Sequence, residues 1–304
     1  MRSRSPRTLT VLVALLVLLI AGLAVWFAVA GGERPAAPTA SNPLLLAVLD
    51  VGQADSIFVR SPAGRTMLVD AGNERKDAEQ VILPYFRRQD VQRLDYLVLS
   101  HPDQDHVGGM PTLLDSVPVG AFVDSVQPGA TNQAYRQSLL RVQSKGIEPI
   151  KARRDQAKID LGLGVTVQVL GPEDPLIGGS SSSNNNSVTL RLTYGSTSVF
   201  LAGDIEDEGE KRLLGHKDDL RSQILKVAHH GAQTSSSNEF LDALRPEVAL
   251  ISVGAGNAYG HPHQPLLQRL ERRQVRVYRT DLNGTLQVVM DGRSYQISSE
   301  RQGR

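Results

Sequence analysis

Six residues that follow a short apolar run limit the fold of this chain more than any other feature. Asp95–Leu99 (DYLVL) predicts a buried strand, and the loop directly after it reads His101-Pro102-Asp103-Gln104-Asp105-His106. A loop at a strand end can turn several of these side chains inward, which a regular helix or strand cannot do. Neutral imidazoles and carboxylates suit Zn²⁺, Mn²⁺ or Fe²⁺ and leave coordination positions open for water. The sequence therefore predicts a metal site on this loop.

Further candidate ligands follow apolar runs later in the chain. Asp204 ends the segment LAGD, and His229 and His230 lie in the segment KVAHHG. Since each segment follows a predicted strand, we expect these side chains at the same edge of the sheets as the first loop. Of the two neighbouring histidines, we expect one to bind metal and the other to support it. His261, in YGHPH, is a further candidate, whereas His216 lies alone in a charged helix and is expected at the surface.

The composition of the chain excludes several classes of functional site. The chain has no cysteine among its 304 residues, which excludes disulfide scaffolds, thiolate zinc sites, iron–sulfur clusters and cysteine nucleophiles. Hydrophobic residues make up 40% and charged residues 21%, which suits a domain with a sizeable buried core. The formal net charge is only +1, so no global basic field indicates nucleic-acid binding.

The N-terminus predicts export. Leu9–Ala30 is almost uninterruptedly apolar and, at about 1.5 Å per residue, long enough to cross a hydrocarbon core of roughly 30 Å. Arg2, Arg4 and Arg7 precede it, which keeps the N-terminus cytoplasmic and places the rest of the chain outside. Cleavage as a signal peptide is the alternative, because Ala28-Val29-Ala30 fits a cleavage site, but the run exceeds an ordinary signal-peptide core. We expect a single-pass membrane protein with an extracytoplasmic domain, or a secreted protein if this segment is cleaved.

The remaining chain predicts one domain. Residues 1–30 form the anchor or signal peptide, 31–43 a Pro- and Ala-rich linker, 44–298 the domain and 299–304 a tail. Strand-rich stretches flanked by surface helices occur twice, which predicts two sheets packed face to face with helices outside, an α+β fold of four layers (αββα). Gly178–Asn186 (GGSSSSNNN) is of low complexity and predicts a flexible loop.

The element boundaries follow from apolar periodicity and turn residues. A terminal pair of strands is expected around Asn283-Gly284. The other predicted strands are 44–49, 56–60, 66–69, 95–99, 119–123, 165–170, 188–194, 197–201, 224–228 and 248–253, and the predicted helices are 77–89, 132–144, 206–214, 238–244 and 265–273.

Taken in order, these motifs resemble the metallo-β-lactamase fold superfamily, and more closely the hydrolase domain of ComEC-type DNA-uptake proteins. The similarity spans residues 44–297. It rests on Asp70-Ala71-Gly72, His101-x-Asp103-x-Asp105-His106, Gly203-Asp204 and His229-His230-Gly231, and on the family phrases resembled by 49–56, 100–109, 185–190, 227–236 and 259–262.

The chain departs from the family pattern at several positions. Asp103 stands where the superfamily usually has its second histidine, a change typical of the ComEC-like branch, and this harder oxygen ligand favours manganese over zinc. Ala54 and Ala232 stand where that branch usually has Gly and Ser. The superfamily's intervening metal histidine is missing, and the Asn-rich run before Val188 occupies its region. The many transmembrane helices of an uptake channel do not occur, so we do not expect this chain to form the pore.

The resemblance implies a site for two divalent ions, zinc or manganese. One ion would be held by His101, Asp103 and Asp204, and the other by Asp105, His106, Asp204 and one of His229 and His230, with Asp204 bridging. Such a pair activates a water and clamps both oxygens of a phosphodiester displacement. Asp105 would also orient the water, His261 would reach the phosphate or the leaving oxygen, and Asp70, Asp50 and Asp55 would tether the ligand loop or cap turns.

We therefore expect an exported metal-dependent hydrolase, a phosphodiesterase acting on DNA. The alternatives are a hydrolase of another ester (phosphocholine, lactone or lactam) and a catalytically weak accessory module that handles DNA. The expected partners are DNA, the membrane through the N-terminal helix, and a separate DNA-uptake channel protein. Five arginines between Arg269 and Arg279 could hold a nucleic-acid backbone, although a solvated face is the favoured interpretation.

Overall fold

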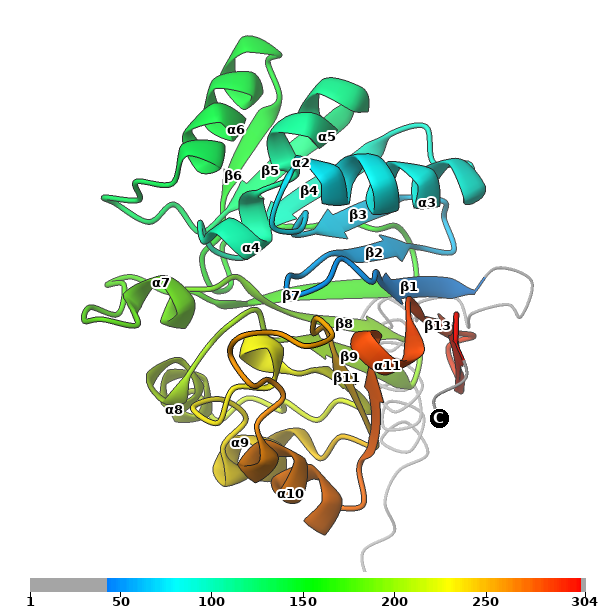
Figure 1. The fold of residues 1–304 in the computed structure, drawn as a ribbon, viewed down its shortest axis with the longest axis vertical. Coiled ribbons are helices and arrows are strands. Elements are labelled where there is room, and N and C mark those ends of the chain that lie inside the picture. The colour runs from blue at the N-terminus through cyan, green and yellow to red at the C-terminus, as the bar shows by residue number, and fades with distance from the viewer. Residues whose placement is uncertain (1–42, 302–304) are drawn as a thin grey trace, which may run out of the picture. The chain divides into compact units, whose positions relative to one another are not determined.

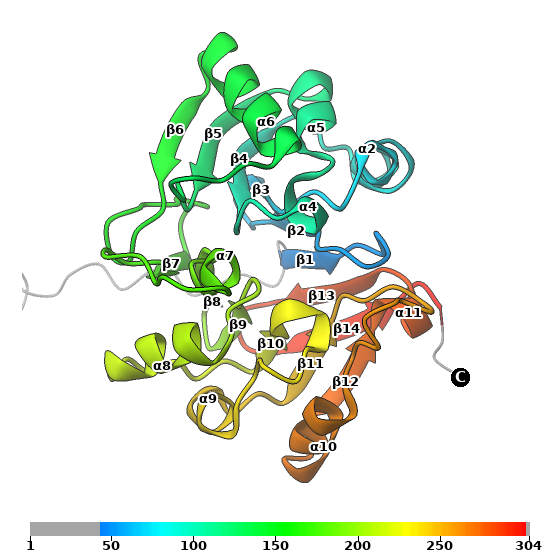
Figure 2. The same ribbon diagram turned by 60° about the vertical axis from the view of Figure 1, so that its left-hand side comes forward.

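Two β-sheets packed face to face form the centre of the computed structural model, which describes residues 43–301 (Figure 1). Helices α3, α5 and α6 cover the outer face of the first sheet, and α8, α9 and α10 cover that of the second (Figures 1 and 2). The order of layers is helix, sheet, sheet, helix, as the sequence predicts.

The first sheet has eight strands in the order β14-β13-β1-β2-β3-β4-β5-β6. Neighbouring strands from β14 to β3 in this order are antiparallel. The pairs β3–β4, β4–β5 and β5–β6 are parallel. The strands are β1 (Leu44–Val48), β2 (Ile57–Arg60), β3 (Thr66–Val69), β4 (Leu94–Leu99), β5 (Val119–Asp124), β6 (Glu148–Lys151), β13 (Leu286–Met290) and β14 (Tyr295–Ser299).

The second sheet has six strands in the order β12-β11-β10-β9-β8-β7. The pairs β12–β11, β11–β10 and β10–β9 are parallel, whereas the pairs β9–β8 and β8–β7 are antiparallel. The strands are β7 (Val165–Gly171), β8 (Thr189–Tyr194), β9 (Thr197–Leu201), β10 (Ile224–Lys226), β11 (Val248–Ile251) and β12 (Arg276–Arg279).

The helices are mostly short. The predicted helix 77–89 is a composite that begins at Arg75, contains a π-helical turn and ends at Arg88. The segments are α2 (Arg75–Asp77), η1 (Ala78–Ile82), α3 (Leu83–Arg88), α4 (Gln104–Val107), α5 (Met110–Ser116), α6 (Gln133–Ser144), α7 (Ser182–Asn185), α8 (Asp207–Gly215), η2 (Ala228–Gly231), α9 (Asn238–Leu244), α10 (Gln264–Arg272) and α11 (Thr280–Asn283).

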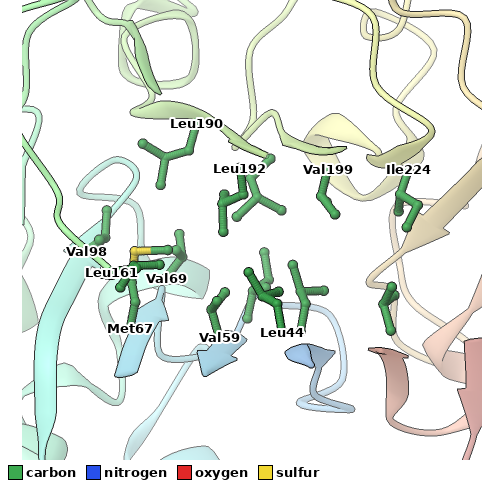
Figure 3. Close-up of a cluster of buried hydrophobic side chains, with 14 of the residues drawn as sticks. Leu44, Val59, Met67, Val69, Val98, Leu161, Leu190, Leu192, Val199 and Ile224 are labelled. Carbon is green, nitrogen blue, oxygen red and sulfur yellow. The ribbon is translucent and has the colours of Figure 1, made fainter. Parts of the chain in front are cut away.

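The strands are apolar on both faces because each sheet lies between two layers. In β1, Leu44 and Leu46 belong to the core between the sheets, whereas Leu45 and Ala47 belong to the core under the helices. Successive strand residues point to opposite faces, so an uninterrupted apolar run is required here. Figure 3 shows side chains of both sheets, among them Val59 and Val199, meeting in the central core.

Two predictions for loops are wrong. Gly178–Asn186 is not an unstructured loop, because it contains α7 and its amide side chains are hydrogen-bonded. Asn185 accepts hydrogen bonds from the backbone N–H groups of Glu206 and Gly209. These contacts with a distant segment give the run a defined structure that its Ser- and Asn-rich composition does not predict. Asn283-Gly284 is not a hairpin turn; it ends α11, and the turn between β13 and β14 lies at residues 291–294.

The predicted N-terminal anchor (1–30) and the predicted linker up to residue 42 lie outside the described residues, as do the last three residues of the predicted tail. Between residues 43 and 301, no helix combines the length and the apolar character needed to cross a membrane.

The fold gathers the candidate ligand loops at one edge. Strands β3 and β4 are parallel neighbours in the first sheet, as are β9, β10 and β11 in the second. Parallel strands end on the same side, so the loops that begin at Asp70, Ser100, Ala202, Val227 and Ser252 emerge together. Figure 2 shows α4 and α7 near the seam between the two sheets.

Candidate metal centre

Four predicted ligands meet at this edge. Asp105, His106, Asp204 and His230 each offer one ligand atom, and the four atoms lie within 4.8 Å of one another. The Nε2 atom of His106 is 3.3 Å from Asp204 Oδ2, and Nε2 of His230 is 3.1 Å from Asp105 Oδ2. Two members come from the α4 segment of the first half and two from loops of the second half, so folding both halves together assembles the group.

Outer contacts orient both imidazoles. The Nδ1 atom of His106 lies 2.8 Å from Asp70 Oδ2, and Asp70 also accepts hydrogen bonds from the N–H and hydroxyl of Ser100. His230 Nδ1 donates to the carbonyl of Ser252 at 2.9 Å. In the neutral rings these bonds place the proton on Nδ1 and direct the Nε2 lone pair into the group, which is the orientation a metal ligand needs. Asp70 therefore acts as the tether expected from the sequence.

The carboxylates and imidazoles of the group shift each other's pKa values. Burial lowers the pKa of His106, but the charges of Asp204, Asp70 and Asp105 outweigh it and raise that pKa well above its usual value. Burial raises the pKa of Asp204, but His106 and His230 outweigh it and lower that pKa well below its usual value. The carboxylates and the imidazoles of the group thus favour each other's charged forms.

His101 and Asp103 lie beside the four-ligand group. His101 Nε2 is 3.6 Å from Asp103 Oδ2, and the rings of His101 and His106 lie 4.1 Å apart. The Nε2 atoms of both histidines are buried without a hydrogen-bond partner. An unpartnered buried polar atom costs about 1–3 kcal/mol, so these nitrogens fit metal ligands better than structural histidines. With imidazole nitrogens and carboxylate oxygens as donors, the site fits divalent zinc or manganese.

The backbone separates the two neighbouring histidines. His229 and His230 both adopt positive φ angles, 50° and 52°. His230 enters the ligand group. His229 Nδ1 instead lies 3.4 Å from Glu206 Oε1, and the backbone N–H of His229 donates to Asp204 Oδ1. The structure therefore brings His230, and not His229, among the candidate ligands, a choice that the sequence leaves open.

Ser187 stands in the region of the missing superfamily histidine. Its hydroxyl lies 3.3 Å from His101 Nδ1 and accepts a hydrogen bond from the N–H of Asp204 at 3.1 Å. Ser183, on α7, donates to Asp103 Oδ1 at 2.6 Å. The Asn-rich segment thus supports the loops that carry the candidate ligands through serine hydroxyls, a role that its composition does not indicate.

A buried ion pair lies behind His230. Lys226 Nζ donates to Asp55 Oδ2 at 2.7 Å, and Asp55 Oδ1 is 3.5 Å from His230 Nδ1. Lys226 and Asp55 are almost fully buried. Lys226 is not among the residues predicted for the site, although a lysine that continues the apolar run IL in β10 is a usable signal. Asp50, in contrast, pairs with Arg301 and does not tether the ligand loop.

His261 lies next to the ligand group. Its ring centroid is 5.6 Å from that of His229 and 6.4 Å from that of His230. Gln53 Oε1 accepts the N–H of Gly254, which leaves Gln53 Nε2 facing His261 Nδ1 at 3.4 Å. An amide nitrogen only donates, so His261 Nδ1 accepts and the neutral ring carries its proton on Nε2.

His216 and the arginines near the C-terminal end both make contacts within the chain. His216 is partly exposed and lies 2.8 Å from Glu173, away from the ligand group. The arginines near the C-terminal end are largely engaged in contacts within the chain: Arg269 donates to carbonyls, Arg273 pairs with Asp242, and Arg279 pairs with Asp281. These contacts favour a structural role over a nucleic-acid patch.

Comparison with known proteins agrees with the motifs. The model of the metallo-beta-lactamase superfamily matches residues 49–255. ComE operon protein 3 of Bacillus subtilis is 36% identical over 79% of this chain and 32% of its own length. Competence protein ComA of Neisseria gonorrhoeae is 34% identical over 92% of this chain and 38% of its own length. Recombination protein 2 of Haemophilus influenzae is 33% identical over 79% of this chain and 28% of its own length. The chain spans about a third of the length of these relatives, and the resemblance to ComEC-type competence proteins is confirmed.

Proposed function

Because this chain belongs to the metallo-β-lactamase superfamily, we propose that it is a metal-dependent phosphodiesterase that cleaves DNA in competence. One observation carries the proposal: the ligand atoms of Asp105, His106, Asp204 and His230 converge within 4.8 Å. The unpartnered Nε2 atom of His101 beside them supports a second ion held with Asp103 and Asp204. The printed names of the relatives, which include competence and recombination, favour DNA over other esters.

A bound divalent ion supplies a Lewis acid and lowers the pKa of water. Asp105 is the carboxylate of the four-ligand group that reaches solvent, since its side chain is 33% exposed against 3% for Asp204. It lines a cleft of about 550 Å³ between the ligand loop, the 127–132 loop and α7. A water in this cleft can donate a hydrogen bond to Asp105, which orients its lone pair toward the phosphorus.

His261 acts as a neutral hydrogen-bond donor to a phosphate or leaving-group oxygen. Burial, followed by the nearby charges of His229 and His230, lowers the pKa of His261 to about 4. The ring is therefore uncharged near neutral pH, and Gln53 leaves its proton on Nε2. Its contribution is orientation and charge stabilisation of the substrate oxygen, rather than delivery of a proton from an imidazolium.

The setting in the cell is part of the proposal. We propose that residues 44–298 form the hydrolase domain, that segment 9–30 anchors it to the membrane or is cleaved on export, and that a separate channel protein is its partner. Protease added to intact cells whose outer envelope has been removed should digest the domain. Protection of the domain until the cells are lysed would contradict export.

The test is cleavage by the full chain. Single-stranded and duplex DNA are incubated with it in Mn²⁺, Zn²⁺ or EDTA, beside Asp105→Ala, His230→Ala and the surface control His216→Ala. We expect metal-dependent cleavage that both site variants lose and the control keeps. Bound metal without cleavage of DNA would refute the nuclease assignment. Turnover of phosphocholine, lactone or lactam esters would then identify another hydrolase, and no turnover of any ester an accessory module.

A further inference from the structure

An exposed aromatic ring lies beside the metal centre. Tyr259 is 67% exposed, on the loop between β11 and α10. Its ring centroid lies 5.7 Å from that of His261, with 24° between the planes. The ring of His261 is in turn 6.4 Å from that of His230, at 25°. A series of three rings, each tilted by about 25° from the next, therefore leads from solvent to a candidate metal ligand.

The loop holds Tyr259 in place. The side-chain oxygen of Asn257 accepts hydrogen bonds from the N–H groups of Tyr259 and His261, and its amide nitrogen donates to the carbonyls of Gly254 and His261. His263 Nδ1 accepts the N–H of Gln233, so its Nε2 carries the proton and donates to the carbonyl of Tyr259 at 3.1 Å. Both backbone groups of Tyr259 are thus fixed, so the loop that carries the ring loses little entropy when a ligand binds.

The charge of the cleft that Asp105 lines indicates what such a ring is for, because Asp105 lies 3.1 Å from His230, the inner ring of the series. The cleft is lined by Asp103 and Asp105 together with uncharged side chains such as Gln127 and Thr131, and no lysine or arginine is among its described lining residues. Affinity for a polyanion must therefore come from bound cations and from contacts that do not depend on charge. Stacking of a base on an aromatic ring is such a contact, worth about 1–3 kcal/mol per base.

We propose that Tyr259 is a stacking platform for one unpaired nucleobase of a single-stranded polynucleotide whose phosphate lies at the metal centre. The proposal rests on the proposed function and deepens it, because it selects single strands. In a duplex both faces of an internal base are covered by its neighbours, so an internal base pair has no free face for Tyr259, whereas an unpaired base has one.

The kinetic test uses the full chain with Tyr259→Ala and Tyr259→Phe. The substrates are a single-stranded oligonucleotide and an oligomer of equal length made of abasic tetrahydrofuran phosphodiesters. Tyr259→Ala should raise KM for the oligonucleotide about 5- to 140-fold, since 1.4 kcal/mol is tenfold, with kcat nearly unchanged. Tyr259→Phe keeps the ring and should behave like the wild type. The abasic oligomer should be indifferent to both changes, and Leu282→Ala, which truncates another exposed apolar side chain, should change nothing.

A binding measurement separates this inference from the cleavage assignment. An oligonucleotide carrying 2-aminopurine is mixed with each variant in Mn²⁺, and its fluorescence is followed from the moment of mixing, before cleavage proceeds. We expect fluorescence quenching by the wild type and Tyr259→Phe and none by Tyr259→Ala. Equal quenching by all variants, no quenching by the wild type, or an equal loss of activity on the abasic oligomer would overturn the stacking role. Tyr259-dependent quenching without cleavage in Mn²⁺ or Zn²⁺ would refute only the nuclease assignment.

Discussion

Removing the buried cation of Lys226 should destabilise the fold strongly. Its Nζ atom donates to Asp55 at 2.7 Å and to the carbonyl of Val227 at 3.0 Å, and neither ionic side chain is more than 1% exposed. Lys226→Met leaves the Asp55 carboxylate buried without its partner, which costs about 3–5 kcal/mol. For a domain of this size each kcal/mol lowers the melting temperature by roughly 2–4 °C, so the expected fall is about 6–20 °C.

A double-mutant cycle isolates the pair. Asp55→Asn alone should cost a comparable amount, because it leaves a buried ammonium unpaired, whereas Asp55→Asn with Lys226→Met removes both charges and should lie close to the wild type. The free energy of unfolding is measured by urea denaturation in EDTA, so that metal binding does not contribute. Lys151→Met is the matched control, since Lys151 pairs with Asp174 at the surface and should change stability by about 1 kcal/mol or less.

Two results would refute this reasoning. A loss below about 1 kcal/mol in Lys226→Met would mean that the carboxylate finds water or another donor, because an unpaired buried charge costs several times more. Additive losses in the double variant would mean that the two side chains do not interact. The pair also bears on the site, since the N–H of Asp55 donates to the carbonyl of Asp105 at 3.1 Å.

Three further predictions concern the site and its support. His230→Ala should lower the metal bound per chain, measured by elemental mass spectrometry, while His229→Ala keeps it, because only His230 joins the ligand group; equal loss would contradict this. Burial, then the charges of His229 and His230, lowers the pKa of His261 from 6.5 to about 4, so its NMR signals should titrate near pH 4 and not near 6.5. The unfolded chain binds this proton more tightly, so the stability that this group contributes is lost as pH falls from 6.5 toward 4. Asn185→Ala removes the acceptor of two backbone N–H groups and should lower the free energy of unfolding by about 2–4 kcal/mol, against no change in the exposed control Ser180→Ala.

Much of the fold could be predicted because its signals are local. The strands 66–69 and 197–201 and the helix 238–244 coincide with the observed elements, since unbroken apolar runs and capping residues determine them. The six residues His101–His106 after β4 also predict the candidate ligand loop. Four of them are His or Asp, and they follow directly on an apolar run that predicts a strand. The terminal pair was misplaced because Asn283-Gly284 is a turn signal that a helix end also uses.

Contacts between distant segments could not be predicted. Asp55 and Lys226 are separated by 171 positions, and neither pattern indicates that the two would meet. Which of His229 and His230 joins the ligand group depends on two successive positive φ angles in a turn. Two neighbouring histidines in a sequence do not indicate these backbone angles. The sequence therefore predicts candidate ligands loop by loop, whereas packing between the sheets determines which of their side chains lie together.

The Asn-rich segment shows why composition misleads at this site. A run of serines and asparagines predicts flexibility only if its polar groups bond to water, yet here they bond to the loops that carry the candidate ligands. Ser187 contacts His101 and the backbone of Asp204, in the region where the superfamily usually supplies a metal-binding histidine. A serine hydroxyl that orients two ligands does not replace an imidazole as a ligand. An ion at His101, Asp103 and Asp204 would therefore receive no imidazole from this segment, and the proposed second ion depends on these three side chains alone.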